Sequence, residues 1–153
     1  MTETNADRPD LAAMVGRLGR SLMAAELPAL RAHDLTMWGY VVLANLDREP
    51  VRTQAALAAA IGADKTRIIG VLDDLQERGL ISRTPDPDDR RVRLLALTAR
   101  GRRVRAAAQA AIRRREERLL ARLSPGDRRG FLRALQALSE LPQTEIVGED
   151  PDD

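Results

Sequence analysis

The 153-residue sequence contains no cysteine and a single histidine, His33. The absence of cysteine excludes a disulfide framework, a thiolate zinc site and a thiol-based oxidant sensor. The sequence also has no glycine-rich phosphate loop and no nucleophile elbow, so no nucleophile–base pair and no metal-ligating set can be assembled. We therefore expect that the protein is not an enzyme and that it binds neither a cofactor nor a metal.

Aromatic residues are scarce, at 2% of the chain, and are limited to Trp38, Tyr40 and Phe131. The core must then be built from leucine, isoleucine, valine and alanine, which favours closely packed helices. No apolar run approaches the roughly 20 residues that cross a bilayer. The N-terminus is polar and acidic, unlike a signal peptide. We expect a cytoplasmic protein.

Positive charge is concentrated in the middle of the chain. Residues 51–135 carry 20 Lys+Arg against 10 Asp+Glu, whereas the other residues carry 5 against 13. A basic middle between acidic ends is typical of a surface that binds a polyanion. A GC-rich gene would explain why arginine outnumbers lysine 24 to 1, but it would not concentrate the charge.

Apolar spacing predicts helices at both ends of the chain. The first runs from Asp10 to about Ala32, and Pro28 is expected to kink or end it. Others are predicted over 36–49, 98–123 and 124–141. The terminal helices are amphipathic and too thin to form a core alone, so we expect them to pack on each other and on a second copy.

The middle of the chain has a helix-turn-helix pattern. Thr53 and Asp64 are predicted N-caps of two short helices, Gly62 supplies the turn between them, and Gly79 ends the second as a left-handed C-cap. The second helix has one buried face, formed by Ile68, Leu72 and Leu75. Its first two turns then expose Lys65, Thr66, Arg67, Ile69 and Gly70.

A hairpin with arginines at its tip follows directly. Strand-like residues 81–83 and 92–97 flank the turn Asp86-Pro87-Asp88-Asp89-Arg90-Arg91, in which proline and aspartate cannot continue a helix. Exposed guanidinium groups suit the minor groove of DNA. The aspartates do not indicate a calcium loop, because the required glycine and downstream glutamate are missing. The hairpin makes the pattern a winged helix-turn-helix.

This order of elements resembles the multiple antibiotic resistance regulator (MarR) family of bacterial transcription factors. The wing matches the family pattern of Asp-x-Arg, five residues and Leu-Thr, with Asp89-Arg90-Arg91 followed by Leu97-Thr98. The end of the second helix matches the pattern at Leu72, Leu75, Gly79, Leu80 and Ile81. The sequence departs from the family at Ile69-Gly70 and Asp73-Asp74, where members commonly carry Thr-Arg and an arginine after the aspartate.

The resemblance implies a mainly helical fold with a small β-hairpin, in which both termini build a dimerisation domain beside the winged helix-turn-helix. The corresponding segments are a disordered tail (1–9), an N-terminal dimerisation helix (10–35), the DNA-binding domain (36–98), C-terminal dimerisation helices (99–142) and an acidic disordered tail (143–153). It also implies a homodimer that binds double-stranded DNA and a small ligand, often an aromatic acid, bound between the two parts.

The expected DNA contacts lie on the two helices and the wing: Thr53, Asp64, Lys65, Thr66, Arg67, Ile69, Gly70, Arg83, Asp89, Arg90, Arg91 and Arg93. Lys65, Thr66 and Arg67 would replace the missing family arginines one turn earlier. A plainer alternative is a solvated turn in which Asp88 and Asp89 pair with the arginines, beside an ordinary exposed helix end.

His33 and Trp38 lie where the family has its ligand pocket and are candidate ligand contacts. Alternatively, His33 is bonded to a nearby carboxylate at a helix end, and Trp38 belongs to the core or walls the pocket.

Two functions remain open. The first is a homodimeric, ligand-responsive regulator, a repressor of a pseudo-palindromic operator. The second is a winged-helix module that binds another protein, or that binds DNA without small-molecule input. A steep fall of DNA affinity with salt would favour the first.

Overall fold

The computed structural model describes residues 8–49 and 52–148. Its contacts divide the chain into two compact units, Met1–Arg115 and Glu116–Asp153. The described residues form a mainly helical fold with a small antiparallel sheet, as the sequence predicts. Within these ranges no helix is both long and apolar enough to cross a bilayer.

Helix α1 spans Leu11–Arg31, close to the predicted bounds, and Pro28 does not end it. The Pro28 carbonyl still accepts a hydrogen bond from the backbone N–H of Ala32 at 3.2 Å. The turn that follows the proline includes Leu30, which is fully buried. Burial of this last turn therefore offsets the backbone hydrogen bond that proline cannot donate.

Helix α2 spans Met37–Arg48, one residue inside the predicted range of 36–49 at each end. The Thr36 side chain accepts a hydrogen bond from Gly39 N at 3.0 Å. One face of α2 is completely buried and consists of Val42, Leu43 and Leu46. This face places α2 at the centre of the first unit's core.

Helices α3 (Gln54–Ile61) and α4 (Lys65–Glu77) form the predicted helix-turn-helix. Gly62 between them and Gly79 after α4 both have left-handed backbones, with φ of 65° and 68°. Such a conformation favours glycine, which confirms the predicted turn and C-cap. The predicted inner face of α4 is buried: Ile68, Leu72 and Leu75.

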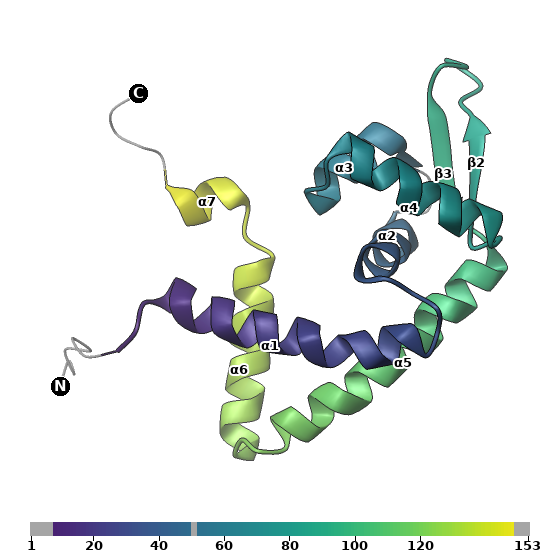
Figure 1. Cartoon of the computed structure of the whole chain (residues 1–153). Helices are drawn as coiled ribbons and strands as arrows, with labels where there is room; N and C mark the ends of the chain where they lie inside the picture. The colour runs from purple at the N-terminus through teal and green to yellow at the C-terminus, as the bar shows by residue number, and fades with distance from the viewer. Residues whose placement is uncertain (1–7, 50–51, 149–153) are drawn as a thin grey trace. The chain divides into compact units, whose positions relative to one another are not determined.

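The wing belongs to a three-stranded antiparallel sheet of order β1-β3-β2. The predicted strands are present as β2 (Ile81–Pro85) and β3 (Arg93–Leu97), and their hairpin projects beyond α3 and α4 (Figure 1). The third strand, β1 (Arg52–Thr53), was not predicted. Two residues show no alternation of polarity, so only the long-range pairing with β3 defines this strand.

Helix α5 spans Ala99–Leu120 and is joined tightly to the end of the helix-turn-helix. The Thr98 hydroxyl donates to Gly79 O at 2.7 Å and accepts from Gly101 N at 2.9 Å. A Cβ on Gly101 would lie 2.0 Å from Leu80 O, so only glycine permits this approach.

The second unit contains α6 (Pro125–Ser139) and α7 (Gln143–Val147). Ser124, the first residue of the predicted helix over 124–141, caps α6 by accepting a hydrogen bond from Asp127 N at 3.1 Å. The predicted disorder over 143–153 is wrong for the five residues of α7. Its first turn carries Glu145, whose charge favours a helix N-terminus, a local signal that the acidic composition concealed.

Candidate nucleic-acid interface

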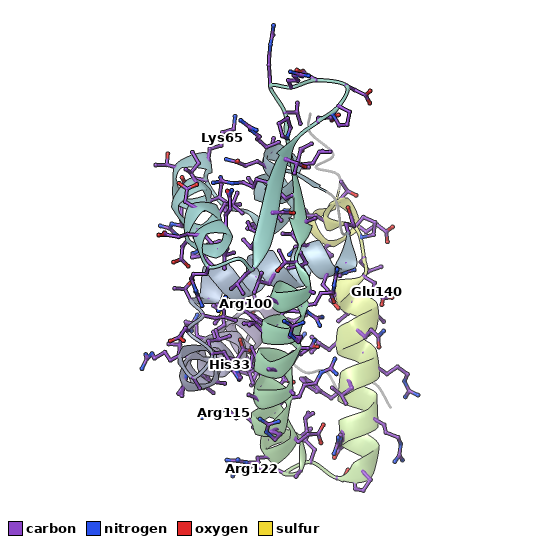
Figure 2. The ribbon with its side chains drawn as sticks, turned by 90° about the vertical axis from the view of Figure 1, so that its right-hand side faces the viewer. His33, Lys65, Arg100, Arg115, Arg122 and Glu140 are labelled. Atoms are coloured by element: carbon purple, nitrogen blue, oxygen red, sulfur yellow. The ribbon has the colours of Figure 1, made fainter. Side chains whose placement is uncertain are left out.

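A groove of about 460 Å³ lies between α3, the start of α4 and the wing. We call it the reading groove; its lining consists of Thr53, Gln54, Ala55, Ala58, Lys65, Ile68, Ile69, Arg91, Val92 and Arg93. Five residues that the sequence assigned to DNA are thus brought together: Thr53, Lys65, Ile69, Arg91 and Arg93. Figure 2 shows Lys65 at the end of this unit that carries the wing, with His33 far from it.

Both helix N-termini at the reading groove are capped by side chains. Thr53 accepts from Ala56 N at 3.1 Å at the start of α3. Asp64 accepts from Thr66 N at 2.8 Å and from Arg67 N at 2.9 Å at the start of α4. Asp64 therefore fixes the backbone under the predicted contact residues, while the side chains of Lys65, Thr66 and Arg67 remain exposed.

The wing turn is closed by its aspartates. The Asp86 side chain accepts from Asp88 N at 2.9 Å, and that of Asp89 accepts from Arg91 N at 3.0 Å. Across the turn, Asp86 N donates to Val92 O at 2.9 Å. These carboxylates thus accept hydrogen bonds from backbone groups, and in the described part of the chain no ion pair joins them to an arginine. The local Asp–Arg pairing that we considered for the turn is absent there, which leaves the tip arginines exposed.

Arg83 has a different environment from the other predicted contacts. Its Nε donates to Gln76 Oε1 at 2.6 Å, and its Nη2 forms an ion pair with Asp73. Only 20% of its side chain is exposed. Arg83 therefore ties the base of the wing to α4, beside a second groove of about 430 Å³ that it shares with Gln54, Gln76 and Arg93.

Sequence reasoning missed the roles of Asp73 and Gln76. Asp73 was noted only as a departure from the family pattern. The available signal was the spacing of three residues, which places this carboxylate and amide on one face of α4. That spacing did not indicate that Arg83, on the neighbouring strand β2, is the cation that these two side chains contact.

The exposed face of α4 contains an apolar residue and a glycine. Ile69 is 45% exposed, and a Cβ on Gly70 would meet no atom of the chain within 4 Å. The protein's own packing thus gives no reason for glycine at this position.

The structure connects the predicted DNA site to one candidate ligand residue. The Arg67 guanidinium carbon lies over the Trp38 ring, 5.8 Å from its centroid. Trp38 and His33 are both half-buried. Sequence reasoning placed Arg67 and Trp38 in separate sites because no local pattern indicates a contact between α2 and α4.

Comparison with known proteins gives the same assignment as the geometry. The model of the MarR family matches residues 35–92, from the start of α2 to the wing. A Thauera aromatica protein named as a transcriptional regulatory protein for the hcr operon is 32% identical over 152 residues, covering 90% of this chain and 92% of that one.

Two solved structures are similar along most of the chain. The transcriptional repressor CouR, bound to a 23-mer DNA duplex, is 31% identical with a TM-score of 0.74, covering 86% of this chain and 93% of that one. A Mycobacterium tuberculosis MarR family protein in complex with salicylic acid is 32% identical with a TM-score of 0.73, covering 87% and 98%. The chain therefore belongs to the MarR family and is a non-enzymatic, DNA-binding transcriptional regulator with a winged helix-turn-helix.

Proposed function

We propose that this regulator is a homodimeric repressor that binds a pseudo-palindromic operator in the cytoplasm and releases it when a small aromatic acid binds. The observation that carries the proposal is the apolar face of α6, formed by Phe131, Leu132, Leu135 and Leu138. No described residue of α6 is buried. We expect a second copy of the chain to cover this face.

The N-terminal helix supports the same arrangement. Along α1, Leu11, Val15 and Met23 are each more than half exposed. Clusters of exposed apolar side chains of this kind mark interaction surfaces. Because most homo-oligomers are twofold symmetric, a dimer built on such faces presents two reading grooves to two half-sites.

The winged helix-turn-helix supports a defined binding mode. The recognition helix is α4, whose first turn would enter the major groove, and the tip arginines Arg90 and Arg91 would reach the minor groove. Half-sites would then lie about 10 base pairs apart, centre to centre. A 23-mer duplex, the length bound by CouR, accommodates two such half-sites.

The ligand is proposed from chemistry and similarity together. A relative at 32% identity binds salicylic acid. The half-buried Trp38 offers an aromatic face, and His33 offers an imidazole that can donate to a carboxylate. We assign both residues to the ligand site.

Footprinting on DNA flanking the protein's own gene tests the proposal. We expect protection of two half-sites and an affinity that falls about 100-fold or more between 50 and 200 mM salt, because several phosphate contacts release counterions. Salicylate should weaken the complex, whereas the non-aromatic control cyclohexanecarboxylate should not. A single protected half-site would contradict the dimer, and indifference to a panel of aromatic acids would favour a regulator without small-molecule input.

A further inference from the structure

Trp38 lies under the guanidinium group of Arg67, at a distance of 5.8 Å from the ring centroid to Arg67 Cζ. This distance lies within the range of about 6 Å in which an aromatic face attracts a cation. We infer that Trp38 is a positioning residue that holds Arg67 in its DNA-reading orientation. The inference rests on the proposed contact between Arg67 and DNA.

The backbone turn that carries the ring is held by the packing of α2. Trp38 lies in the first turn of α2, which the Thr36 side chain caps through Gly39 N. Gly39, the next residue, is buried, and a Cβ there would lie 3.7 Å from Leu75 Cδ2 on α4. The turn that carries Trp38 is therefore packed directly against the recognition helix, which holds the Trp38 backbone close to α4.

Arg67, in contrast, has a fixed backbone and an exposed side chain. Asp64 accepts a hydrogen bond from its N–H at 2.9 Å. Within the part of the chain that the structure describes, no ion pair holds its guanidinium group. An arginine free to rotate loses rotamer entropy when it contacts DNA, and stacking on a ring removes part of that loss in advance.

The contact with Trp38 leaves Arg67 able to bind DNA. An indole ring has no hydrogen-bond acceptor, so it occupies none of the five N–H donors of the guanidinium group. Those donors remain available for a phosphate or for the O6 and N7 atoms of a guanine. Trp38 thus restrains the side chain without competing for the atoms that read DNA.

Arg67 is also the arginine on which base reading by α4 depends. Lys65 and Arg67 are the basic residues of α4, and of these two only the arginine has a planar, two-pronged group that can contact a guanine edge. Because Ile69-Gly70 cannot supply such a contact, the orientation of Arg67 determines sequence preference.

A double-mutant cycle on the full chain tests the inference, using a duplex selected by the wild-type protein from random-sequence DNA. We expect Arg67→Ala to weaken binding about 10-fold. Trp38→Leu should weaken binding about 3- to 5-fold when Arg67 is present and should have no further effect in Arg67→Ala. Trp38→Phe, which keeps an aromatic face, should stay within about 2-fold of wild type.

Each contrary result has a distinct meaning. An equal loss from Trp38→Leu with and without Arg67 would overturn the inference, because Trp38 would then act only through folding. Unchanged affinity of Trp38→Leu would overturn it as well. Unchanged affinity and sequence preference of Arg67→Ala would instead refute the proposed DNA contact itself.

A second measurement does not depend on the folding of a Trp38 variant. Trp38 is the single tryptophan of the chain, so its fluorescence reports one site. We expect acrylamide to quench it more strongly in Arg67→Ala than in the wild-type protein. Equal quenching would show that the guanidinium group does not cover the ring in solution, which overturns the inference.

Discussion

The winged helix-turn-helix and helix α6 are built from the same residue types, yet their apolar residues have opposite environments. In the winged unit Leu57, Leu72 and Leu95 are completely buried. On α6, Leu135 and Leu138 are 46% and 52% exposed. One region completes its core within a single chain, whereas the other leaves an apolar face open. The DNA-reading part can therefore be understood from one chain, whereas we expect the apolar face of α6 to be covered by a second copy.

The largest effect should come from a charge on the open face. We expect Leu135→Arg to weaken self-association and operator binding by about 100-fold or more, because an unpaired charge would be buried between the copies. Analytical ultracentrifugation and binding titrations measure both effects. The matched control is Ala137→Arg on the opposite side of α6, which should remain wild-type. A dimeric Leu135→Arg protein would show that this face of α6 does not mediate self-association.

A methyl group added at Gly101, where α5 meets Leu80, should have the next largest effect. Gly101→Ala places a Cβ against Leu80 O, so we expect it to lower the free energy of unfolding by about 2–3 kcal/mol. Gly70→Ala is the control, since space around it is open. It should raise stability by about 0.5–1 kcal/mol through helix propensity. Thermal denaturation distinguishes them, and equal midpoints would refute the tight joint.

The wing tip should have an intermediate effect that is limited to DNA. We expect Arg91→Ala to weaken binding about 10-fold on specific and scrambled duplexes alike, and to reduce the salt slope by about 1. Stability should not change, because Arg91 is exposed. Arg17→Ala on α1 is the control for loss of one exposed arginine. If both variants bind equally well, the wing has no role in affinity.

The smallest effect should come from the tie between wing and recognition helix. Arg83→Ala removes the contacts with Asp73 and Gln76. Since the Asp73 carboxylate is 57% exposed, we expect a loss of stability below about 1 kcal/mol. We also expect a smaller loss of DNA affinity than in Arg91→Ala. An Arg83→Ala loss larger than that of Arg91→Ala would identify Arg83 as a direct DNA contact.

Local features of the fold were predictable from the sequence. The caps Thr53 and Asp64, the left-handed Gly62 and Gly79, and the wing strands all follow from backbone preferences over a few residues. Half of the residues that line the reading groove were also predicted DNA contacts: Thr53, Lys65, Ile69, Arg91 and Arg93. The caps and the glycine turns depend on hydrogen bonds to residues nearby in the chain, and a local sequence pattern encodes such bonds.

Features that depend on distant partners were not predictable. The strand β1 exists only through β3, and the environment of Arg83 depends on two side chains of α4. The contact between Trp38 and Arg67 joins elements that no periodicity relates. The continuation of α1 past Pro28 likewise depends on burial of the following turn. In each case tertiary packing overrides or adds to the local preference.

The close contact between Gly101 and Leu80 fixes the start of α5 to the end of the helix-turn-helix. The 22 residues of α5 extend about 33 Å, and after Gly101 no glycine or proline interrupts them. The first turn of α5 lies directly against Leu80, which follows the helix-turn-helix. The helix therefore has little freedom to bend at this point. A tilt of about 10° would then correspond to about 6 Å of travel at the far end.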